Sequence, residues 1–223
     1  MRNQPFRNFE WIIIDGGSKD GTLQLIKDSS DVITRWISEP DRGIYDAWNK
    51  GISLCNGRWI SFLGADDIYL PNGLNDYASF LIENENTELD YVSSRVNFVT
   101  KNNKYIRTVG SKWAWQKFKR RMNSAHVGSL HNKELFNKVG LFDLNFRICG
   151  DYELLLRSKN SLKTGFVDSI TAEMTVGGVS DSYEAIKESM KAKLLSGDGN
   201  YYICLIEKQW AITKCFFRKL LWY

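Results

Sequence analysis

Proline, histidine and long apolar runs are scarce in this sequence, and each scarcity excludes a class of protein. Three prolines and no low-complexity segment argue against two domains joined by a linker. No run approaches the roughly 20 apolar residues of a membrane span, and the N-terminal segment carries no secretory signal. Two histidines, with four cysteines that form no C-x-x-C pair, offer little for a zinc site. We therefore expect a soluble, cytoplasmic domain whose cysteines stay reduced instead of forming a disulfide framework.

The composition is that of an ordinary folded protein. Hydrophobic residues make up 43% and charged residues 25% of the 223, which excludes disorder of the whole chain. The formal charge of +4, from 30 basic and 26 acidic residues, is too small to require a nucleic acid, and we expect none as a partner. The basic, aromatic segment Lys112–Arg121 could bind a diphosphate-linked lipid, a membrane surface or single-stranded nucleic acid, or be a solvated helix face.

Strand-like and helix-like segments alternate in the first half of the chain. Apolar runs predict strands at 9–15, 32–38 and 59–63, and helices are predicted from about residues 22, 44 and 71. This βαβαβα pattern predicts an α/β fold, with an open, mostly parallel, Rossmann-like sheet and helices on both faces. Such sheets bind ligands at the carboxyl ends of their strands.

The second half is less regular and predicts a mixed α+β arrangement. A hairpin is expected from 91–99 and 104–109, and helices are expected at 132–138, 151–158, 183–195 and 201–223. We expect one domain, 1–223, whose first part is 1–100, whose second part is 101–200 and whose last part, 201–223, is an amphipathic helix.

The adjacent acids Asp66 and Asp67 directly follow the third predicted strand. Two neighbouring carboxylates repel each other and favour a cation between them. Their oxygens suit Mg²⁺ or Mn²⁺ bridging a diphosphate. The alternative is a helix N-cap or an exposed turn, where Asp is common.

A second candidate site is the loop after the first predicted strand. Asp15 ends that strand, and Gly16, Gly17 and Gly21 let the backbone approach a ligand. The loop is neither a P-loop nor G-x-G-x-x-G. An acid there could hydrogen-bond a ribose or a base, or simply cap a tight turn.

Four segments together resemble the bacterial family 2 glycosyltransferases of the GT-A fold, particularly those that build surface polysaccharides. In chain order they are FEWIIIDGGSKDGT, SEPDRGIYDAWNKGI, GRWISFLGADD and HNKELFNKVGLFDLNFRICGDYELLLR. The likeness runs from about Asn8 to Arg157. It implies that 1–100 is the nucleotide-sugar-binding half and 101–200 the acceptor-side half. Relatives begin with a further strand, which this sequence lacks at its start.

The resemblance also assigns roles to individual residues. Asp15, Asp41, Arg42 and Asp66 match nucleotide-sugar contacts, and Asp67 matches the ligand of Mn²⁺ or Mg²⁺. Asp151 matches the general base, and its place at a helix start should favour the carboxylate form. His126 matches a histidine on the acceptor side, although a structural histidine is the plainer alternative. Glu153, two positions further along the helix, should face away from Asp151.

The implied reaction moves a sugar, with inversion, from a nucleotide-diphosphate donor to a growing glycan or a lipid-linked acceptor. The alternative is a truncated relative that binds a nucleotide or a partner without catalysis. The C-terminal stretch 201–223 mixes aromatic residues with Lys and Arg, so we expect peripheral contact with anionic lipid at the inner face of the cell membrane. It could equally pack on the domain and finish the fold.

Overall fold

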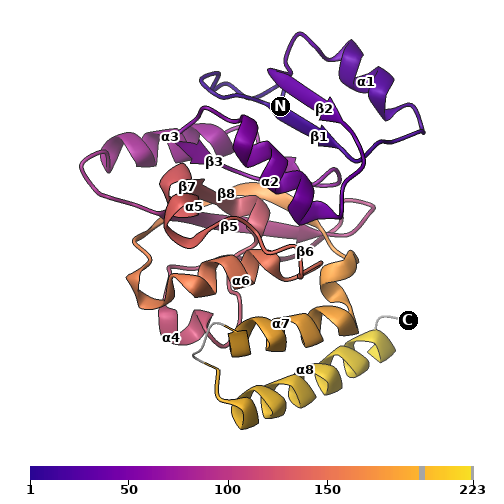
Figure 1. Cartoon of the computed structure of the whole chain (residues 1–223), viewed down its shortest axis with the longest axis vertical. Coiled ribbons are helices and arrows are strands. Elements are labelled where there is room, and N and C mark those ends of the chain that lie inside the picture. Colours follow the sequence, from indigo (N-terminus) through magenta and orange to yellow (C-terminus); the bar gives the residue numbers. More distant parts are fainter. Residues whose placement is uncertain (196–198, 222–223) are drawn as a thin grey trace.

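The computed structural model describes residues 1–195 and 199–221, and its strands form two sheets (Figure 1). The smaller sheet joins β1 (Ile12–Asp15) to β2 (Arg35–Ser38) in parallel, which places Asp15 beside Ser38. Helix α1 (Thr22–Asp28) connects the two strands, and α2 (Ile44–Leu54) packs on β1. The first βαβα segment therefore forms as the sequence predicts.

The larger sheet has the order β3-β7-β5-β8-β4, and β6 pairs with the free part of β5. Its strands are β3 (Trp59–Ile60), β4 (Ile68–Tyr69), β5 (Tyr91–Val99), β6 (Tyr105–Val109), β7 (Ser129–Asn132) and β8 (Thr164–Thr175). The expected hairpin is β5–β6, which turns through Asn103 at a positive φ of 57°.

The strand directions correct the expectation of a mostly parallel sheet. Among the described strands, only β1–β2 and β5–β8 pair in parallel, and the other pairings are antiparallel. A continuous apolar run reports a strand that is covered on both faces, and it does not report the direction of the neighbouring strand. The α/β class itself is confirmed.

Helices cover both faces of the larger sheet. Tyr91 of β5 points into a core built with α4 (Trp115–Phe118), α5 (Lys133–Val139) and α6 (Gly150–Arg157). Its neighbour Val92 points into a second core that contains Tyr77 of α3 (Gly73–Glu83). Because successive strand residues face opposite sides, one strand contributes to both cores.

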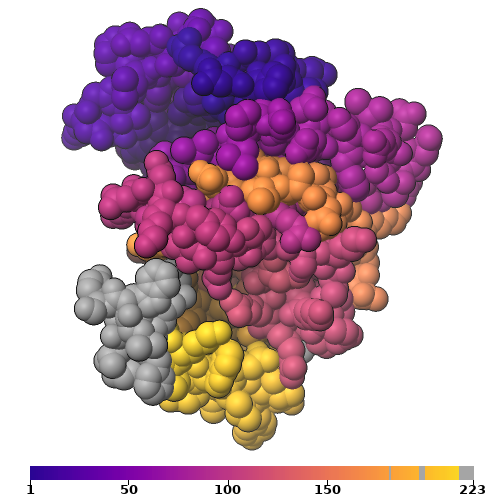
Figure 2. All heavy atoms as spheres, turned by 180° about the vertical axis from the view of Figure 1, so that it is seen from behind, coloured from indigo at the N-terminus to yellow at the C-terminus, as the bar shows by residue number. Residues whose placement is uncertain are grey.

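The last two helices lie at the end of the molecule opposite the β1–β2 sheet (Figure 1). They are α7 (Tyr183–Leu195) and α8 (Tyr201–Leu221), which contact each other, and α7 also contacts α6. Figure 2 shows the same succession of layers from behind. In the described ranges, no helix is both long enough and apolar enough to cross a membrane. The four cysteines are free thiols.

Three short 3₁₀ turns complete the described structure, at His126–Gly128, Lys159–Ser161 and Val179–Asp181. The first of them introduces β7, and its residue His126 is one of the candidate site residues.

Candidate functional site

Asp15 holds the loop that follows β1. Its Oδ2 accepts hydrogen bonds from the Gly17 amide (3.1 Å), the Ser18 amide (3.0 Å) and the Ser38 hydroxyl (2.6 Å). The hydrogen bonds with Ser18 and Ser38 are the main causes of a lowered pKa for this buried carboxyl. Asp15 therefore stays ionised at neutral pH and fixes the glycine loop.

Asp41 lies against that same loop. A Cβ placed on Gly16 would come within 2.6 Å of the Asp41 Oδ2, so a larger residue there would make the Asp41 carboxylate move. The other oxygen, Oδ1, accepts from the Gly43 amide at 2.8 Å. The guanidinium of Arg42 is exposed and forms an ion pair with Asp46 at 3.3 Å.

Asp66 and Asp67 lie between β3 and β4, and both side chains fold back over Gly64. A Cβ on Gly64 would lie 2.9 Å from the Asp67 Oδ2 and 3.4 Å from the Asp66 Oδ1. Thr175 of β8 anchors the turn, because its hydroxyl donates to the Asp66 carbonyl at 2.9 Å and its amide to the Asp67 Oδ1 at 3.3 Å. The strand β8, distant in sequence, therefore fixes both acids.

Burial, and then the charge of Asp66, raise the pKa of Asp67 to about 6. This like-charge strain is what a divalent cation would relieve, and carboxylate oxygens are the ligands that Mg²⁺ and Mn²⁺ prefer. Among the described residues, no three His, Cys, Asp or Glu side chains gather as a metal cage. An ion held by Asp66 and Asp67 would take its remaining ligands from water or from a bound molecule.

Asp151 is the second residue of α6 and is partly buried. Its Oδ1 accepts from the Tyr152 amide at 2.9 Å and from the Tyr45 hydroxyl at 3.3 Å. Burial nevertheless raises its pKa to about 6, so the expected effect of the helix N-terminus is outweighed. A carboxyl with this pKa is mostly ionised at neutral pH and is a stronger base than an exposed aspartate.

Two residues that the sequence did not single out hold Asp151 in place. Tyr45 of α2 also donates to the Ile148 carbonyl at 2.7 Å, and a Cβ on Gly150 would meet the Tyr45 ring at 2.7 Å. Glu188 of α7 accepts from the three amides that precede α6, those of Arg147, Ile148 and Cys149. Tyr45 and Glu188 each lie more than 35 positions in sequence from the residues that they contact at the start of α6, so no local pattern could have revealed them.

Glu153 faces away from Asp151, as expected. It is buried and forms an ion pair with Arg157, whose guanidinium also donates to the Val139 carbonyl at 3.0 Å. Its role is therefore to hold α6 against the end of α5.

His126 lies in an aromatic cluster. Its ring stacks on Trp48 with centroids 4.4 Å apart, and it also stacks on Phe62. Burial lowers its pKa well below the ordinary value, so the ring is neutral at physiological pH. Its Nε2 has no hydrogen-bond partner in the part of the chain that the structure describes. The acceptor-side role of His126 stays a prediction.

Helix α2 begins beside one group of candidate residues and contacts another. It begins two residues after Arg42, its Tyr45 reaches Asp151, and its Trp48 packs on Phe62, which leads toward Asp66. The candidate residues thus form three groups: Asp15 with Asp41, Asp66 with Asp67, and Asp151 with Tyr45. Helix α2 begins near the first group and contributes Tyr45 to the third, and the printed contacts of the second are with Gly64 and Thr175.

The sequence matches the family model "Glycosyl transferase family 2" over residues 1–144. Among curated proteins, a PGL/p-HBAD biosynthesis glycosyltransferase of Mycobacterium bovis is 29% identical over 195 residues, covering 82% of this chain and 72% of that protein. An uncharacterized glycosyltransferase of Rickettsia typhi is 29% identical over 161 residues, covering 68% of this chain and 49% of that protein. The chain therefore belongs to glycosyl transferase family 2.

Solved structures show the same fold. TarS 1–349 of Staphylococcus aureus in complex with UDP-GlcNAc superposes with a TM-score of 0.64 at 16% identity, covering 91% of this chain and 62% of that chain. The mannosyltransferase PcManGT of Pyrobaculum calidifontis, in complex with GDP-Man and Mn²⁺, gives 0.59 at 13% identity, covering 96% and 68%. The expected GT-A fold is confirmed, and the chain is an enzyme domain of the glycosyltransferase class that spans less than two thirds of TarS 1–349.

Proposed function

We propose that this family 2 glycosyltransferase moves a sugar from a nucleotide-diphosphate donor to a hydroxyl of a growing glycan or a lipid-linked acceptor, with inversion at the anomeric carbon. The observation that carries the proposal is Asp151, a partly buried carboxylate with a pKa near 6, fixed at the start of α6 by Tyr45 and Tyr152.

The carboxylate of Asp151 would take the proton of the acceptor hydroxyl. As that oxygen forms its bond to the anomeric carbon, the bond between this carbon and the diphosphate oxygen breaks on the opposite face of the sugar. Oδ1 is engaged by Tyr45 and Tyr152, so Oδ2 is the oxygen that would accept the proton. The configuration of the anomeric carbon is inverted because the acceptor oxygen displaces the diphosphate in a single step from the opposite face.

On the donor side, Asp15, Asp41, Arg42 and Asp66 would contact the nucleotide sugar. The Oδ2 of Asp15 accepts the hydrogen bonds that hold the loop, so its Oδ1 would accept a hydrogen bond from the ribose or the base. Arg42 presents an exposed guanidinium, which suits a diphosphate.

Asp67 would hold Mn²⁺ or Mg²⁺, with Asp66 beside it. When bound there, the ion supplies positive charge for the diphosphate that leaves. The raised pKa of Asp67 supports this role, because burial and the charge of Asp66 disfavour the ionised form, which a bound cation would stabilise.

We also propose that α8 contacts the inner face of the cell membrane. Three exposed side chains spaced by four positions, Tyr202, Ile206 and Trp210, lie along one outward face of α8. The ammonium of Lys214 lies 5.0 Å from the centroid of the Trp210 ring. Aromatic and aliphatic side chains beside a cation favour the interface of an anionic bilayer.

Release of nucleoside diphosphate from a panel of nucleotide sugars, with Mn²⁺ and with lipid-linked acceptors, tests the proposed reaction. Because neighbours of the fold bind UDP-GlcNAc and GDP-Man, UDP- and GDP-sugars head the panel. At least one donor should turn over only when an acceptor is present. A donor that binds but never turns over, with any acceptor, would favour the non-catalytic alternative.

A further inference from the structure

We infer that Glu188 of α7 is a positioning residue for the proposed base: it holds the chain that leads into Asp151 and places a negative charge near that carboxyl. Because this role presupposes that Asp151 takes the acceptor proton, it rests on the proposed function. Glu188 is half-buried, lies in a different helix from Asp151 and acts on it through the backbone that precedes α6.

The carboxylate of Glu188 accepts hydrogen bonds from three consecutive backbone amides. Its Oε2 accepts from Ile148 at 2.8 Å, from Cys149 at 3.0 Å and from Arg147 at 3.1 Å, and its Oε1 accepts from Arg147 at 3.0 Å. Cys149 is the N-cap residue of α6, and Asp151 is the second residue of that helix. Amides at a helix N-terminus carry partial positive charge, which makes a carboxylate their fitting partner. Glu188 therefore fixes the backbone immediately ahead of the base.

The backbone of Ile148 joins Glu188 to another partner of Asp151. Its amide donates to Glu188, and its carbonyl accepts from the Tyr45 hydroxyl at 2.7 Å. The same hydroxyl lies 3.3 Å from the Asp151 Oδ1. A shift of Ile148 would therefore move both the backbone that carries the base and the hydroxyl beside it.

Helix α7 presents one face to the segment that precedes α6. Ala185, Glu188 and Lys191 are spaced by three positions, so they lie on successive turns of the same side. The Ala185 carbonyl accepts from the Cys149 thiol at 3.3 Å. The Lys191 ammonium donates to the Asn145 carbonyl at 3.0 Å. Glu188 is thus the middle one of three attachments along this face.

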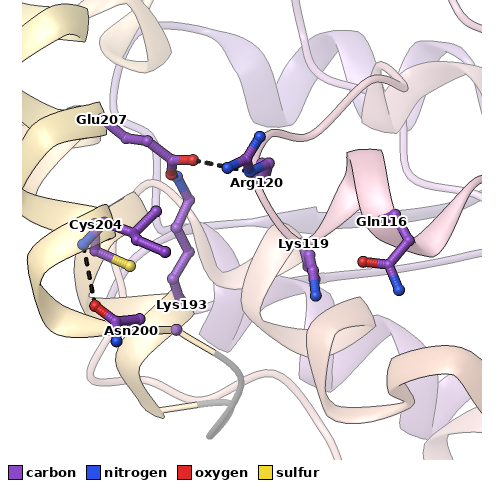
Figure 3. Close-up of a pocket in the computed structure, with 9 residues that line it drawn as sticks. Gln116, Lys119, Arg120, Lys193, Asn200, Cys204 and Glu207 are labelled. Atoms are coloured by element: carbon purple, nitrogen blue, oxygen red, sulfur yellow. Dashed lines mark hydrogen bonds and ion pairs between the residues drawn. The ribbon is translucent and has the colours of Figure 1, made fainter.

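The C-terminal end of α7 is held by α8 and by the segment after α4. The ammonium of Lys193 lies 2.8 Å from the Glu207 Oε2, and the other oxygen of Glu207 lies 3.3 Å from the Arg120 Nε (Figure 3). Lys193 is only 9% exposed, so this contact is largely removed from water. Because α7 is held at this end and also packs on α6, it is a firm support for the carboxylate of Glu188.

Glu188 also contributes charge to the surroundings of Asp151. Among the described residues, the titratable groups that interact with Asp151 are Tyr45 of α2, Tyr91 of β5, Cys149 ahead of α6, and Glu188. Burial raises the pKa of the first three, to about 12 for Tyr91 and Cys149, so these groups are neutral at physiological pH. The negative charge among them is that of Glu188, which adds to burial in raising the pKa of Asp151. A more basic carboxylate takes the acceptor proton more readily.

The test compares Glu188→Ala and Glu188→Gln with the wild type, all in the full chain. Glu188→Ala removes the acceptor of three amides, so kcat should fall about tenfold to a hundredfold, as for a misplaced base, while the KM of the donor stays unchanged. Glu188→Gln keeps one oxygen acceptor and should recover part of this loss. In both variants the midpoint of the kcat–pH profile should lie below that of the wild type, because loss of the negative charge lowers the pKa of Asp151.

Glu184→Gln is the matched control, since it removes an exposed carboxylate from the first turn of the same helix. It should leave kcat and the pH midpoint unchanged. If kcat and donor affinity fell by the same factor in both Glu188 variants, Glu188 would be a general support of the fold and the inference would be overturned. Where Glu188→Ala does not fold, Glu188→Gln decides.

Titration of the Asp151 carboxyl by carbon NMR gives a readout that needs no turnover. The signal of Asp151 is the one that disappears in Asp151→Asn. It should titrate at a lower pH in Glu188→Gln than in the wild type, and at the wild-type pH in Glu184→Gln. If no donor turns over in the wild type, the proposed function fails, whereas this titration still decides whether Glu188 acts on Asp151. An unchanged titration in Glu188→Gln would overturn the inference.

Discussion

Two carboxyl groups of the candidate site, those of Asp67 and Asp151, have pKa values raised to about 6. Burial is the first cause in both. A folded-state pKa above the ordinary aspartate value means that the folded protein binds the proton more tightly than the unfolded chain does. Stability is therefore lost as the pH rises from about 4 to about 6, and at neutral pH the fold carries two ionised groups at a cost.

Asp67→Asn should separate the metal role of this residue from its effect on the fold. Donor binding should lose its dependence on Mn²⁺, because the amide is a poor ligand for the ion. The free energy of unfolding at neutral pH should rise by about 1–2 kcal/mol, and the gain should vanish near pH 4. Calorimetry of donor binding with and without Mn²⁺, and thermal melts at both pH values, give the two results.

Asp168→Asn is the matched control, because the hydrogen bond from Arg95 lowers the pKa of Asp168. This variant should be somewhat less stable at neutral pH and should bind the donor as the wild type does. Unchanged, Mn²⁺-dependent donor affinity in Asp67→Asn would contradict the metal assignment.

The pH profile of turnover should report Asp151. With donor, acceptor and Mn²⁺ saturating, kcat should rise with pH and reach half of its plateau near pH 6, since only the carboxylate accepts a proton. Steady-state rates measured between about pH 5 and pH 8 provide the check. A rate that stays constant across this range would exclude Asp151 as the base.

The sequence singled out these acids as candidates, Asp67 because it follows an apolar strand and Asp151 because the resemblance to the family points to it at a helix start. It could not predict their pKa values. The shift at Asp151 depends on burial by segments far away in the chain, and the hydroxyl of Tyr45 comes from 106 positions away. Solvent exclusion is a property of the assembled layers, so local sequence carries no signal for it.

At the scale of elements, the contact between Tyr45 of α2 and the start of α6 positions the proposed base. The ring of Tyr45 lies directly on the backbone of Gly150, the residue before Asp151. The ring can lie there because Gly150 has no Cβ, and the Tyr45 hydroxyl thereby reaches both Ile148 and Asp151.

Gly150→Ala should therefore disturb both stability and activity. The added methyl group would meet three atoms of the Tyr45 ring at 2.7–2.9 Å, which should cost about 1–3 kcal/mol as Tyr45 and the start of α6 shift. Since Asp151 moves with its helix, kcat should fall more than donor affinity. Chemical denaturation and steady-state kinetics measure the two effects.

Gly178→Ala provides the comparison. A Cβ at Gly178 meets no atom within 4 Å, and the φ of −75° suits any residue, so this variant should behave as the wild type. If Gly150→Ala had the same stability and kcat as Gly178→Ala, the contact between Gly150 and Tyr45 would not matter for stability or catalysis.

Element boundaries followed from the sequence far better than strand directions did. Helix α7 spans the predicted 183–195, and α5 ends at Val139 before Gly140, as its sequence indicates. Caps and amphipathic spacing are local, so they fix helix ends. Strand pairing joins segments that are distant in sequence, such as β5 with β7 and β8, and no local pattern encodes its direction.

At the scale of the whole molecule, the β1–β2 sheet and α8 lie at opposite ends (Figure 1). The nucleotide-binding groups are proposed near the first end and the membrane contact at the second. In this arrangement α8 would bind a lipid surface while the glycine loop after β1 stays in solvent.

Ile206→Gln should weaken binding to vesicles that contain anionic lipid, because it removes an apolar side chain from the outward face of α8. Ile82→Gln is a closely matched control, since Ile82 of α3 is likewise an isoleucine with 70% of its surface exposed. Co-sedimentation at low and high salt measures both, and added salt should weaken the wild-type interaction. If the two variants bind vesicles equally well, α8 is not the membrane contact.

The most direct measurement of the proposed chemistry is the turnover of Asp151→Asn on an established donor–acceptor pair. The amide keeps the shape of the side chain but cannot accept the proton, so kcat should fall by about 10²–10⁴ while donor and Mn²⁺ affinity persist. Glu184→Gln, which removes an exposed carboxylate from the first turn of α7, should leave both quantities unchanged. Near-normal kcat in Asp151→Asn would place the base elsewhere and contradict the mechanism.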